Sequence, residues 1–179
     1  MKNILMLKKI NNSEFEEIIK DLLEHDVVKE MKNYRQHYDC SCYDHCKQVA
    51  YYTYSFCKKH NLDYVSATRA AMLHDLFLYD WRVKSEKCPR LHGFRHPRIA
   101  LNNAMKYFDL NEKEKDIILK HMWPLTPTLP KYKESYVITF TDKYSTLKES
   151  LEHYKNNSKI QKVQRYAYVF FSLLIIRFI

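Results

Sequence analysis

A single glycine, Gly93, occurs among the 179 residues of the chain. Glycine adopts positive φ without steric cost and lets a ligand approach the backbone closely. Tight hairpins, phosphate-binding loops and dinucleotide-binding loops therefore depend on it. A chain with one glycine is poorly suited to a sheet-rich fold and to nucleotide binding through glycine-rich loops. We expect it to be almost entirely helical.

Apolar residues recur along most of the chain at the spacing of amphipathic helices, with polar breaks between them. Ser13, followed by Glu16 three residues later, is typical of a helix N-terminus. The pattern predicts an all-α fold, a single-domain bundle over residues 1–179 with about seven helices, at 14–35, 41–60, 63–81, 97–108, 112–122, 133–155 and 158–178. Two proline-containing stretches, 82–96 and 123–131, are predicted to be irregular.

Basic residues outnumber acidic ones, with 30 Lys and Arg against 21 Asp and Glu, and the formal net charge is +9. This excess suits an anionic small molecule, nucleic acid or an acidic membrane surface. The lysines are spread along the predicted helices rather than gathered into one block, so nucleic acid is the less favoured partner. The sequence does not indicate an oligomeric state.

The cysteines and the two ends of the chain bear on its location. Five cysteines, an odd number, and an N-terminus without a secretory leader pattern favour reduced thiols and a cytoplasmic protein. The strongly apolar residues 166–179 include Arg177, and the run is shorter than the roughly 20 residues of a membrane-spanning helix. We therefore predict that the helix at 158–178 docks on the core rather than spanning a membrane.

The stretch AAMLHDLFLYD, residues 70–80, places His74 and Asp75 within an apolar run. A buried carboxylate is costly unless it is compensated, so Asp75 requires a cation, hydrogen-bond donors or access to water. Imidazole or carboxylate groups recur at comparable places in or directly beside other predicted helices, at His45, His96, His121 and Asp142. Such side chains bind Zn, Mn and Fe ions, and their recurrence predicts a metal site built from several helices.

Taken in chain order over roughly residues 35–151, these histidines and aspartates resemble the ligand series of the HD-domain superfamily of metal-dependent phosphohydrolases. The resemblance implies a helical fold in which one metal ion is bound by His45, His74, Asp75 and Asp142. In the dinuclear branch it further implies a second ion bound by His96 and His121, with Asp75 bridging the pair. That branch includes bacterial dinucleoside-tetraphosphate hydrolases and cyclic-dinucleotide phosphodiesterases, and the chain lacks the Gly-Tyr-Pro signature of the latter.

The expected cofactor is a pair of divalent transition-metal ions, of Fe, Mn, Co or Zn. Two such ions lower the pKa of a bridging water and clamp the attacked phosphorus and its leaving oxygen. The resemblance therefore implies hydrolysis of a phosphoester or phosphoanhydride bond in a nucleotide or small phosphorylated metabolite. The expected catalytic residues are Asp75, His74 and Lys143. Cationic side chains beside the ligands, Lys143, Arg95 and Arg98, are placed to contact phosphate oxygens.

Some of these assignments have alternatives. His92 lies four residues before His96 and could replace it as a ligand or bind substrate. His96 is preferred because Pro97 is expected to start a helix there. Asp44 and Asp80 either orient a ligand imidazole or are exposed acids. The remaining histidines are expected to be ordinary core or surface residues: His25, His37, His60 and His153.

A structural zinc site is the competing metal site. The stretch HYDCSCYDHC, residues 37–46, offers closely spaced thiols and imidazoles, but zinc sites usually combine two Cys pairs, and no second pair follows. Two other functions stay open on the helical metal site. One is a metal-dependent oxygenase acting on a small alcohol, and the other is a non-catalytic nucleotide-sensing module.

Overall fold

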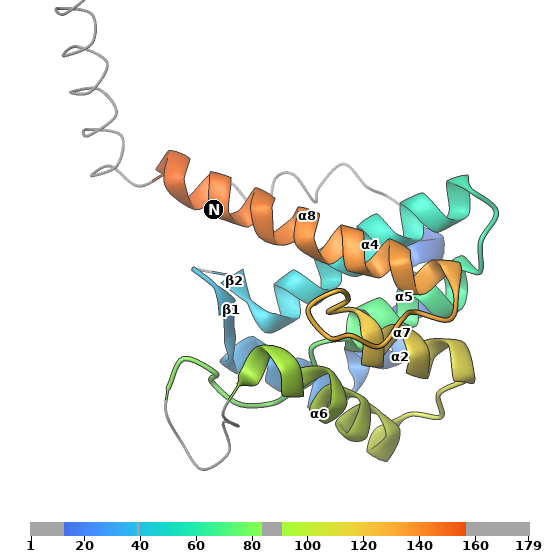
Figure 1. The fold of residues 1–179 in the computed structure, drawn as a ribbon, viewed down its shortest axis with the longest axis horizontal. Helices are drawn as coiled ribbons and strands as arrows, with labels where there is room; N and C mark the ends of the chain where they lie inside the picture. The colour runs from blue at the N-terminus through green and yellow to red at the C-terminus, as the bar shows by residue number, and fades with distance from the viewer. Residues whose placement is uncertain (1–12, 39, 84–90, 157–179) are drawn as a thin grey trace, which may run out of the picture.

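A computed structural model describes residues 13–38, 40–83 and 91–156. Within these ranges seven α-helices account for most of the chain, and the strands are limited to one short hairpin (Figure 1). This confirms the predicted all-α fold. None of the helices in these ranges has both the length and the apolar character required to cross a lipid bilayer. The helix predicted at 158–178, and its docking on the core, lie outside the described residues.

The helices follow in the order α2 (Ser13–Glu24), α3 (Asp26–Glu30), α4 (Cys42–Lys59), α5 (Tyr64–Leu73), α6 (His92–Tyr107), α7 (Glu112–Lys120) and α8 (Lys133–Asn156). A 3-10 turn, η1 (Met31–Asn33), leads into the antiparallel strands β1 (Arg35–His37) and β2 (Cys40–Ser41). α5 is central and contacts α2, α4, α6, α7 and α8. In Figure 1, α8 runs along one edge of the bundle and α6 along the opposite edge.

Side-chain caps fix the starts of three helices that carry site residues. Ser41 Oγ accepts a hydrogen bond of 3.1 Å from the backbone N–H three residues later, at the start of α4. Asp63 does the same at 3.1 Å for α5. Asn111 and Glu114 form a reciprocal capping box at the start of α7. Each such cap stabilises its helix by about 1 kcal/mol, and together the caps determine where these helices begin.

The interior of the bundle is built around α5. Seven of its ten residues are buried, and three of these, Ala67, Ala70 and Ala71, are small enough to let neighbouring helices approach closely. Larger side chains from α2 and α7, including Ile19, Leu22 and Ile117, complete the apolar core. The end of α5 is therefore held firmly inside the molecule, and His74 follows it directly.

The helix predicted at 14–35 differs from the structure in its second half. α2 ends at Glu24, and His25 caps α3, with its Nδ1 accepting a hydrogen bond of 3.2 Å from the backbone N–H of Val27. The chain then enters the β1–β2 hairpin, which the scarcity of glycine disfavours. Its turn uses Tyr38 at φ 48°, a left-handed conformation that glycine adopts more easily.

The helix predicted at 63–81 ends earlier, at Leu73. His74 and Asp75 therefore lie just beyond α5 rather than in the middle of a helix, and the backbone N–H of Phe77 turns back to the carbonyl oxygen of Asp75 at 2.8 Å. Within a helix, adjacent side chains diverge by about 100°. Ending the helix here allows two consecutive side chains to face the same interior point.

The helix predicted at 97–108 begins earlier, at His92. Residues 92–96 are therefore helical rather than irregular, and Pro97 lies inside α6. His92 and His96 consequently occupy the same side of this helix, one turn apart.

Candidate metal centre

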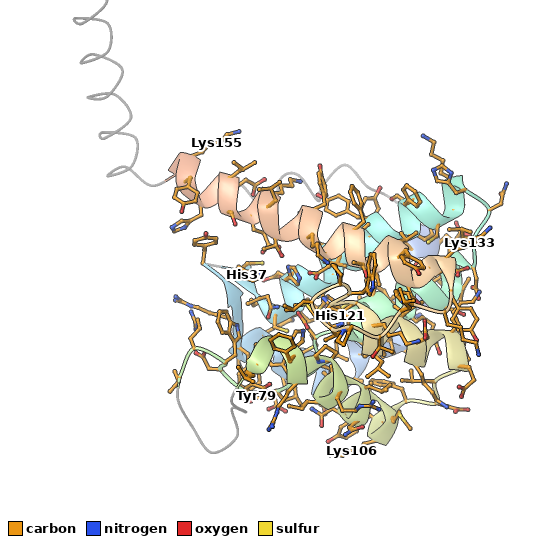
Figure 2. The ribbon with its side chains drawn as sticks, in the orientation of Figure 1. His37, Tyr79, Lys106, His121, Lys133 and Lys155 are labelled. Carbon is orange, nitrogen blue, oxygen red and sulfur yellow. The ribbon has the colours of Figure 1, made fainter. Side chains whose placement is uncertain are left out.

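The six side chains predicted as metal ligands meet in one cluster inside the bundle. They come from α4, the end of α5, the start of α6, the end of α7 and the middle of α8: His45, His74, Asp75, His96, His121 and Asp142. Three of them, His45, His74 and His121, are completely buried, and the others are more than nine-tenths buried. Figure 2 shows His121 in the interior, between α8 and α6.

Three of the four histidines are held in one tautomer by the backbone. The distance from Nδ1 to a carbonyl oxygen three or four residues earlier is 2.7 Å in His74, 3.0 Å in His96 and 2.9 Å in His121. A carbonyl oxygen only accepts hydrogen bonds, so each of these Nδ1 atoms carries the proton. Nε2 of each ring faces the cluster, and this is the arrangement in which histidine binds a metal ion.

His45 is held by a carboxylate instead. Its Nδ1 lies 2.8 Å from Glu149 Oε1, and its Nε2 lies 3.1 Å from Asp142 Oδ1. Glu149 was missed in the sequence, although it lies seven residues after Asp142 and therefore on the same side of α8. Its contact with Nδ1 fixes the orientation of the His45 ring and leaves Nε2 directed into the cluster.

Neither acid that was considered for this orienting role performs it. Asp44 accepts a hydrogen bond of 2.7 Å from Ser41 Oγ at the start of α4. Asp80 forms an ion pair of 2.7 Å with Arg82. Asp44 fits the alternative prediction of an exposed acid, whereas Asp80 is half-buried.

Asp75 lies at the centre of the cluster, and its two oxygens face different histidines. Oδ1 is 3.2 Å from His96 Nε2 and 3.5 Å from His121 Nε2, whereas Oδ2 is 3.4 Å from His74 Nε2. Asp142 Oδ1 lies 3.8 Å from the same His74 nitrogen. Atoms that bind one ion at about 2.0–2.2 Å are themselves about 3.0–3.5 Å apart, so most of these separations are those of ligands around an ion.

Several buried atoms of the cluster lack the partners that their chemistry requires. His96 Nε2 and His121 Nε2 are 2.8 Å apart, although both rings carry their proton on Nδ1, so two lone pairs face each other. His74 Nε2 and Asp75 Oδ1 make no hydrogen bond within the described part of the chain. Unpartnered buried polar atoms are costly, and a cation would satisfy all four of these atoms. The buried His and Asp groups could therefore hold a metal ion, as the sequence predicts.

The close packing of charges shifts several pKa values. Burial opposes ionisation of Asp75 and Asp142, but the neighbouring imidazoles outweigh it and hold the pKa of both carboxyls well below its usual range. Burial also disfavours a charged His45, but Asp142 and Glu149 raise its pKa to about 10. Burial, together with the charge of His74, lowers the pKa of His121 to about 3. Near pH 7 the aspartates are therefore carboxylates and His121 is neutral, which are the forms that bind metal. Asp75 also raises the pKa of His74 against the effect of burial, so His74 and His45 would each release a proton on binding a metal ion.

Gln36, on β1, is a further contact that the sequence did not indicate. Its buried Nε2 amide donates a hydrogen bond of 2.5 Å to Asp75 Oδ2. The hairpin thus holds the oxygen of Asp75 that does not face His96 and His121. No sequence signal marked Gln36, because the strand that carries it was not expected.

The structure brings His96, and not His92, against Asp75. His92 Nδ1 lies 3.0 Å from the Tyr79 hydroxyl, and its ring stacks on Trp81 and on His96, with centroids 5.4 Å and 4.7 Å apart. Burial and the neighbouring His96 lower its pKa to about 4, so it is neutral. The preference for His96 agrees with this geometry. The reason for it was wrong, because the helix begins at His92 and not at Pro97.

The cations predicted to contact phosphate lie on α8 and α6. Lys143 Nζ donates hydrogen bonds to the backbone carbonyl oxygens of Trp123 and Thr139, at 3.0 Å and 3.2 Å, and burial lowers its pKa. Arg95 and Arg98 are exposed on α6 and form no ion pair with any other described residue. Their contact with substrate stays a prediction.

The competing zinc site receives no support from the described residues. None of the potential metal-binding groups found there contains a cysteine. Cys42 and Cys46 are buried in the core, and Cys42 Sγ donates a hydrogen bond of 3.2 Å to the backbone carbonyl oxygen of Asp75. His37, predicted to be an ordinary histidine, instead forms a potential metal-binding group with His45 and Glu149.

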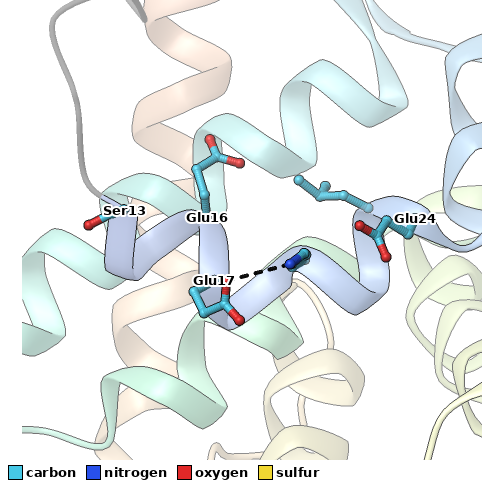
Figure 3. Close-up of a pocket in the computed structure, with 6 residues that line it drawn as sticks. Ser13, Glu16, Glu17 and Glu24 are labelled. Atoms are coloured by element: carbon cyan, nitrogen blue, oxygen red, sulfur yellow. Dashed lines mark ion pairs between the residues drawn. The ribbon is translucent and has the colours of Figure 1, made fainter.

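A groove on α2 is separate from this cluster (Figure 3). It is lined by Ser13, Glu16, Glu17, Lys20, Leu23 and Glu24, and Glu17 forms an ion pair of 3.9 Å with Lys20. Three acids against one lysine give the groove a negative charge that repels anions. It therefore does not extend the candidate site for a phosphorylated substrate.

Compared with known proteins, the chain matches no family model, no curated protein and no solved structure. The chemistry of the cluster itself therefore carries the functional inference.

Proposed function

We propose that this protein is an HD-type metal-dependent phosphohydrolase that cleaves a phosphoester or phosphoanhydride bond of a nucleotide or a small phosphorylated metabolite. The observation that carries the proposal is the position of Asp75, whose two oxygens face two sets of histidine Nε2 atoms. A carboxylate in this position would serve as a ligand shared by two ions. The chain order of the ligands, which resembles that of the HD-domain superfamily, supports the same function.

The proposed ligands divide between two ions. The first ion would be held by His45, His74, Asp75 and Asp142, and the second by Asp75, His96 and His121. The burial of all six side chains limits the access of bulk water, which strengthens the electrostatic interactions between ligands and ions.

The bound ions would supply hydroxide near neutral pH and positive charge beside the phosphoryl group. The residues of the chain perform the remaining tasks. Asp75 and Asp142 provide the negative charge that retains the ions, and Glu149 holds the proton on His45 Nδ1. Gln36 fixes Asp75 Oδ2. A nucleophilic side chain would not be required, because bound ions would supply the nucleophile from water.

An anionic substrate suits the charge of the chain and the cations near the cluster. The formal net charge is +9, and Lys143 directly follows the ligand Asp142. To meet a phosphate oxygen, Lys143 would exchange its hydrogen bonds to two neutral backbone carbonyls for one to an anionic oxygen, in which donor and acceptor are both charged.

The direct test is turnover. Protein supplied with Mn²⁺, Fe²⁺ or Co²⁺ is expected to cleave at least one member of a panel of nucleoside phosphates, dinucleoside polyphosphates and sugar phosphates, measured as release of phosphate or nucleotide. Nucleotide binding without turnover would favour the sensing module. Metal-dependent oxygen uptake with a small alcohol would favour the oxygenase.

Replacing Lys143 with Ala is expected to lower kcat/KM for the active substrate by about 10- to 150-fold. One charge-assisted hydrogen bond to phosphate, worth about 1.5–3 kcal/mol, would be lost. The matched control is Lys133→Ala, because Lys133 is an exposed lysine at the start of the same helix. An equal effect of both substitutions would assign Lys143 to general surface charge rather than to substrate contact.

A second prediction concerns the number of ions. Protein purified without chelator is expected to contain close to two transition-metal ions per chain, measured by inductively coupled plasma mass spectrometry. His121→Ala should lower this toward one, because His121 is proposed as a ligand of the second ion. The control His60→Ala, at the end of α4 and outside the cluster, should leave it unchanged. A wild-type content of one ion would contradict the dinuclear centre and leave a mononuclear one.

A further inference from the structure

The outward face of α8 is apolar and only partly covered by the rest of the bundle. The rings of Tyr136, Tyr144 and Tyr154 contact one aromatic ring each outside α8 and remain exposed. Six large side chains project from it, each 42% to 65% exposed: Tyr136, Phe140, Tyr144, Leu147, Leu151 and Tyr154. Each follows the previous one by three or four residues, so all six lie on one side of the helix. We call this set the α8 stripe.

The stripe is unusual because the other side of α8 already packs on the bundle. Ile138, Ser145 and Asp142 on that side are buried. A helix at the surface normally presents polar residues to solvent opposite its buried side. Figure 1 shows α8 along the outer edge of the bundle, and Figure 2 shows side chains projecting outward from it. A continuous exposed apolar surface of this kind marks a contact surface.

We propose that the α8 stripe is the docking surface for the C-terminal segment of the same chain, residues 157–179. This segment follows α8 directly and contains the most apolar stretch of the sequence, YAYVFFSLLIIRFI. Its sequence repeats apolar residues at the spacing found in the stripe: Ile160, Val163, Ala167, Phe170, Leu174 and Phe178. These residues would share one side of a helix.

The lengths of the two surfaces match. The stripe extends from Tyr136 to Tyr154, and the repeat in the segment extends from Ile160 to Phe178, which is the same number of residues. At 1.5 Å per residue both cover about 27 Å. A reversal of the chain between Tyr154 and Ile160 would let the segment run antiparallel along the whole stripe.

A second copy of the chain is the weaker candidate for the same surface. The covalent connection gives the segment an effective concentration on the order of millimolar at the stripe, above that of a second chain in solution. Docking on α8 also removes apolar side chains of both partners from water at once.

The test is a photo-cross-link in the full-length chain. Leu147→p-benzoylphenylalanine is expected to cross-link to the region around Ala167, and Phe140→p-benzoylphenylalanine to the region around Leu174, as an antiparallel arrangement requires. The control site is Leu129, which is 63% exposed but lies before α8 and should give no such product. Mixing unlabelled and ¹⁵N-labelled protein shows whether both cross-linked peptides come from one chain.

Products within one chain support the proposal, and products that join labelled to unlabelled chains overturn it in favour of a second copy. Absence of a cross-link to the segment also overturns it, and sedimentation of that protein with vesicles of anionic phospholipid would then assign the segment to a lipid surface.

An independent measurement uses trypsin. The double variant Leu147→Glu, Leu151→Glu should be cleaved after Arg165 at least tenfold faster than wild type, whereas Leu129→Glu should not. Equal cleavage of wild type and double variant would contradict docking.

Discussion

Replacing Asp75 with Asn is expected to remove metal binding and hydrolysis together. Asn keeps the size and shape of the side chain but loses the charge that both proposed ions require. Asp75 lies within 3.5 Å of Nε2 of three histidines, His74, His96 and His121, so it is the ligand that the two ions would share. We expect the metal content to fall to less than one ion per chain and turnover to fall by orders of magnitude.

The control for this variant is Asp44→Asn. Asp44 is an acid in the first turn of α4, close in sequence to His45, but it bonds only to the helix cap in the described structure. The Asp44→Asn variant should retain metal and activity, and circular dichroism should show the same helicity for Asp44→Asn and Asp75→Asn. Normal metal content in Asp75→Asn would mean that this carboxylate is not a ligand, and the proposed centre would have to be abandoned.

The sequence predicted the type of fold better than the ends of its helices. α4 and α7 agree closely with prediction because capping residues and an amphipathic pattern both mark them. α5 was predicted too long because the run after Asp75 is apolar. Leu76, Phe77 and Tyr79 are buried, so their apolar character serves the core in a non-helical segment. Periodicity does not distinguish a buried loop from a buried helix.

The start of α6 was predicted too late because Pro97 resembles a first helical residue. Pro97 is the sixth residue of α6, past the first turn, where its missing N–H cannot donate to the carbonyl oxygen four residues earlier and its ring crowds that carbonyl, yet the helix continues through it. A proline therefore limits where a helix can start without fixing it. The hairpin at 35–41 was missed for a related reason, since Tyr38 adopts the positive φ that glycine would be expected to supply.

The candidate metal-binding cluster was visible in the sequence because imidazoles and carboxylates are out of place in apolar helical segments. Glu149 was not visible because it lies in a stretch rich in charged residues, KESLEHYK, where a glutamate resembles a solvated acid. Only its separation of seven residues from Asp142 hinted that the two share one side of α8. Gln36 and His37 could not be placed without the hairpin, because their neighbours in space are distant in sequence.

Metal is expected to raise the melting temperature, and to raise it more at high pH than at low pH. A ligand at about 100 to 1,000 times its Kd stabilises the folded state by about 2.7–4.1 kcal/mol. For a chain of this length, that stabilisation corresponds to a rise in melting temperature of roughly 5–16 °C. Differential scanning calorimetry with Mn²⁺ and with chelator, at pH 6, 7 and 8, measures both effects. Asp75→Asn is the control, and its melting temperature should not respond to metal.

The direction of the pH effect follows from His45. Without metal, Asp142 and Glu149 raise its pKa from 6.5 to about 10 against the opposing effect of burial. Its paired charge therefore stabilises the folded state fully below pH 6.5, and this contribution is lost as the pH rises toward 10. A metal ion at Nε2 must displace that proton, so metal affinity should rise about tenfold per pH unit for each proton released. At a fixed excess of metal, the stabilisation of the folded state by metal should grow by about 1.4 kcal/mol per pH unit. That raises the metal-induced shift in melting temperature by roughly 3–6 °C per pH unit. An equal metal-induced shift at pH 6 and pH 8 would mean that His45 gives up no proton to the ion, and would exclude it as a ligand.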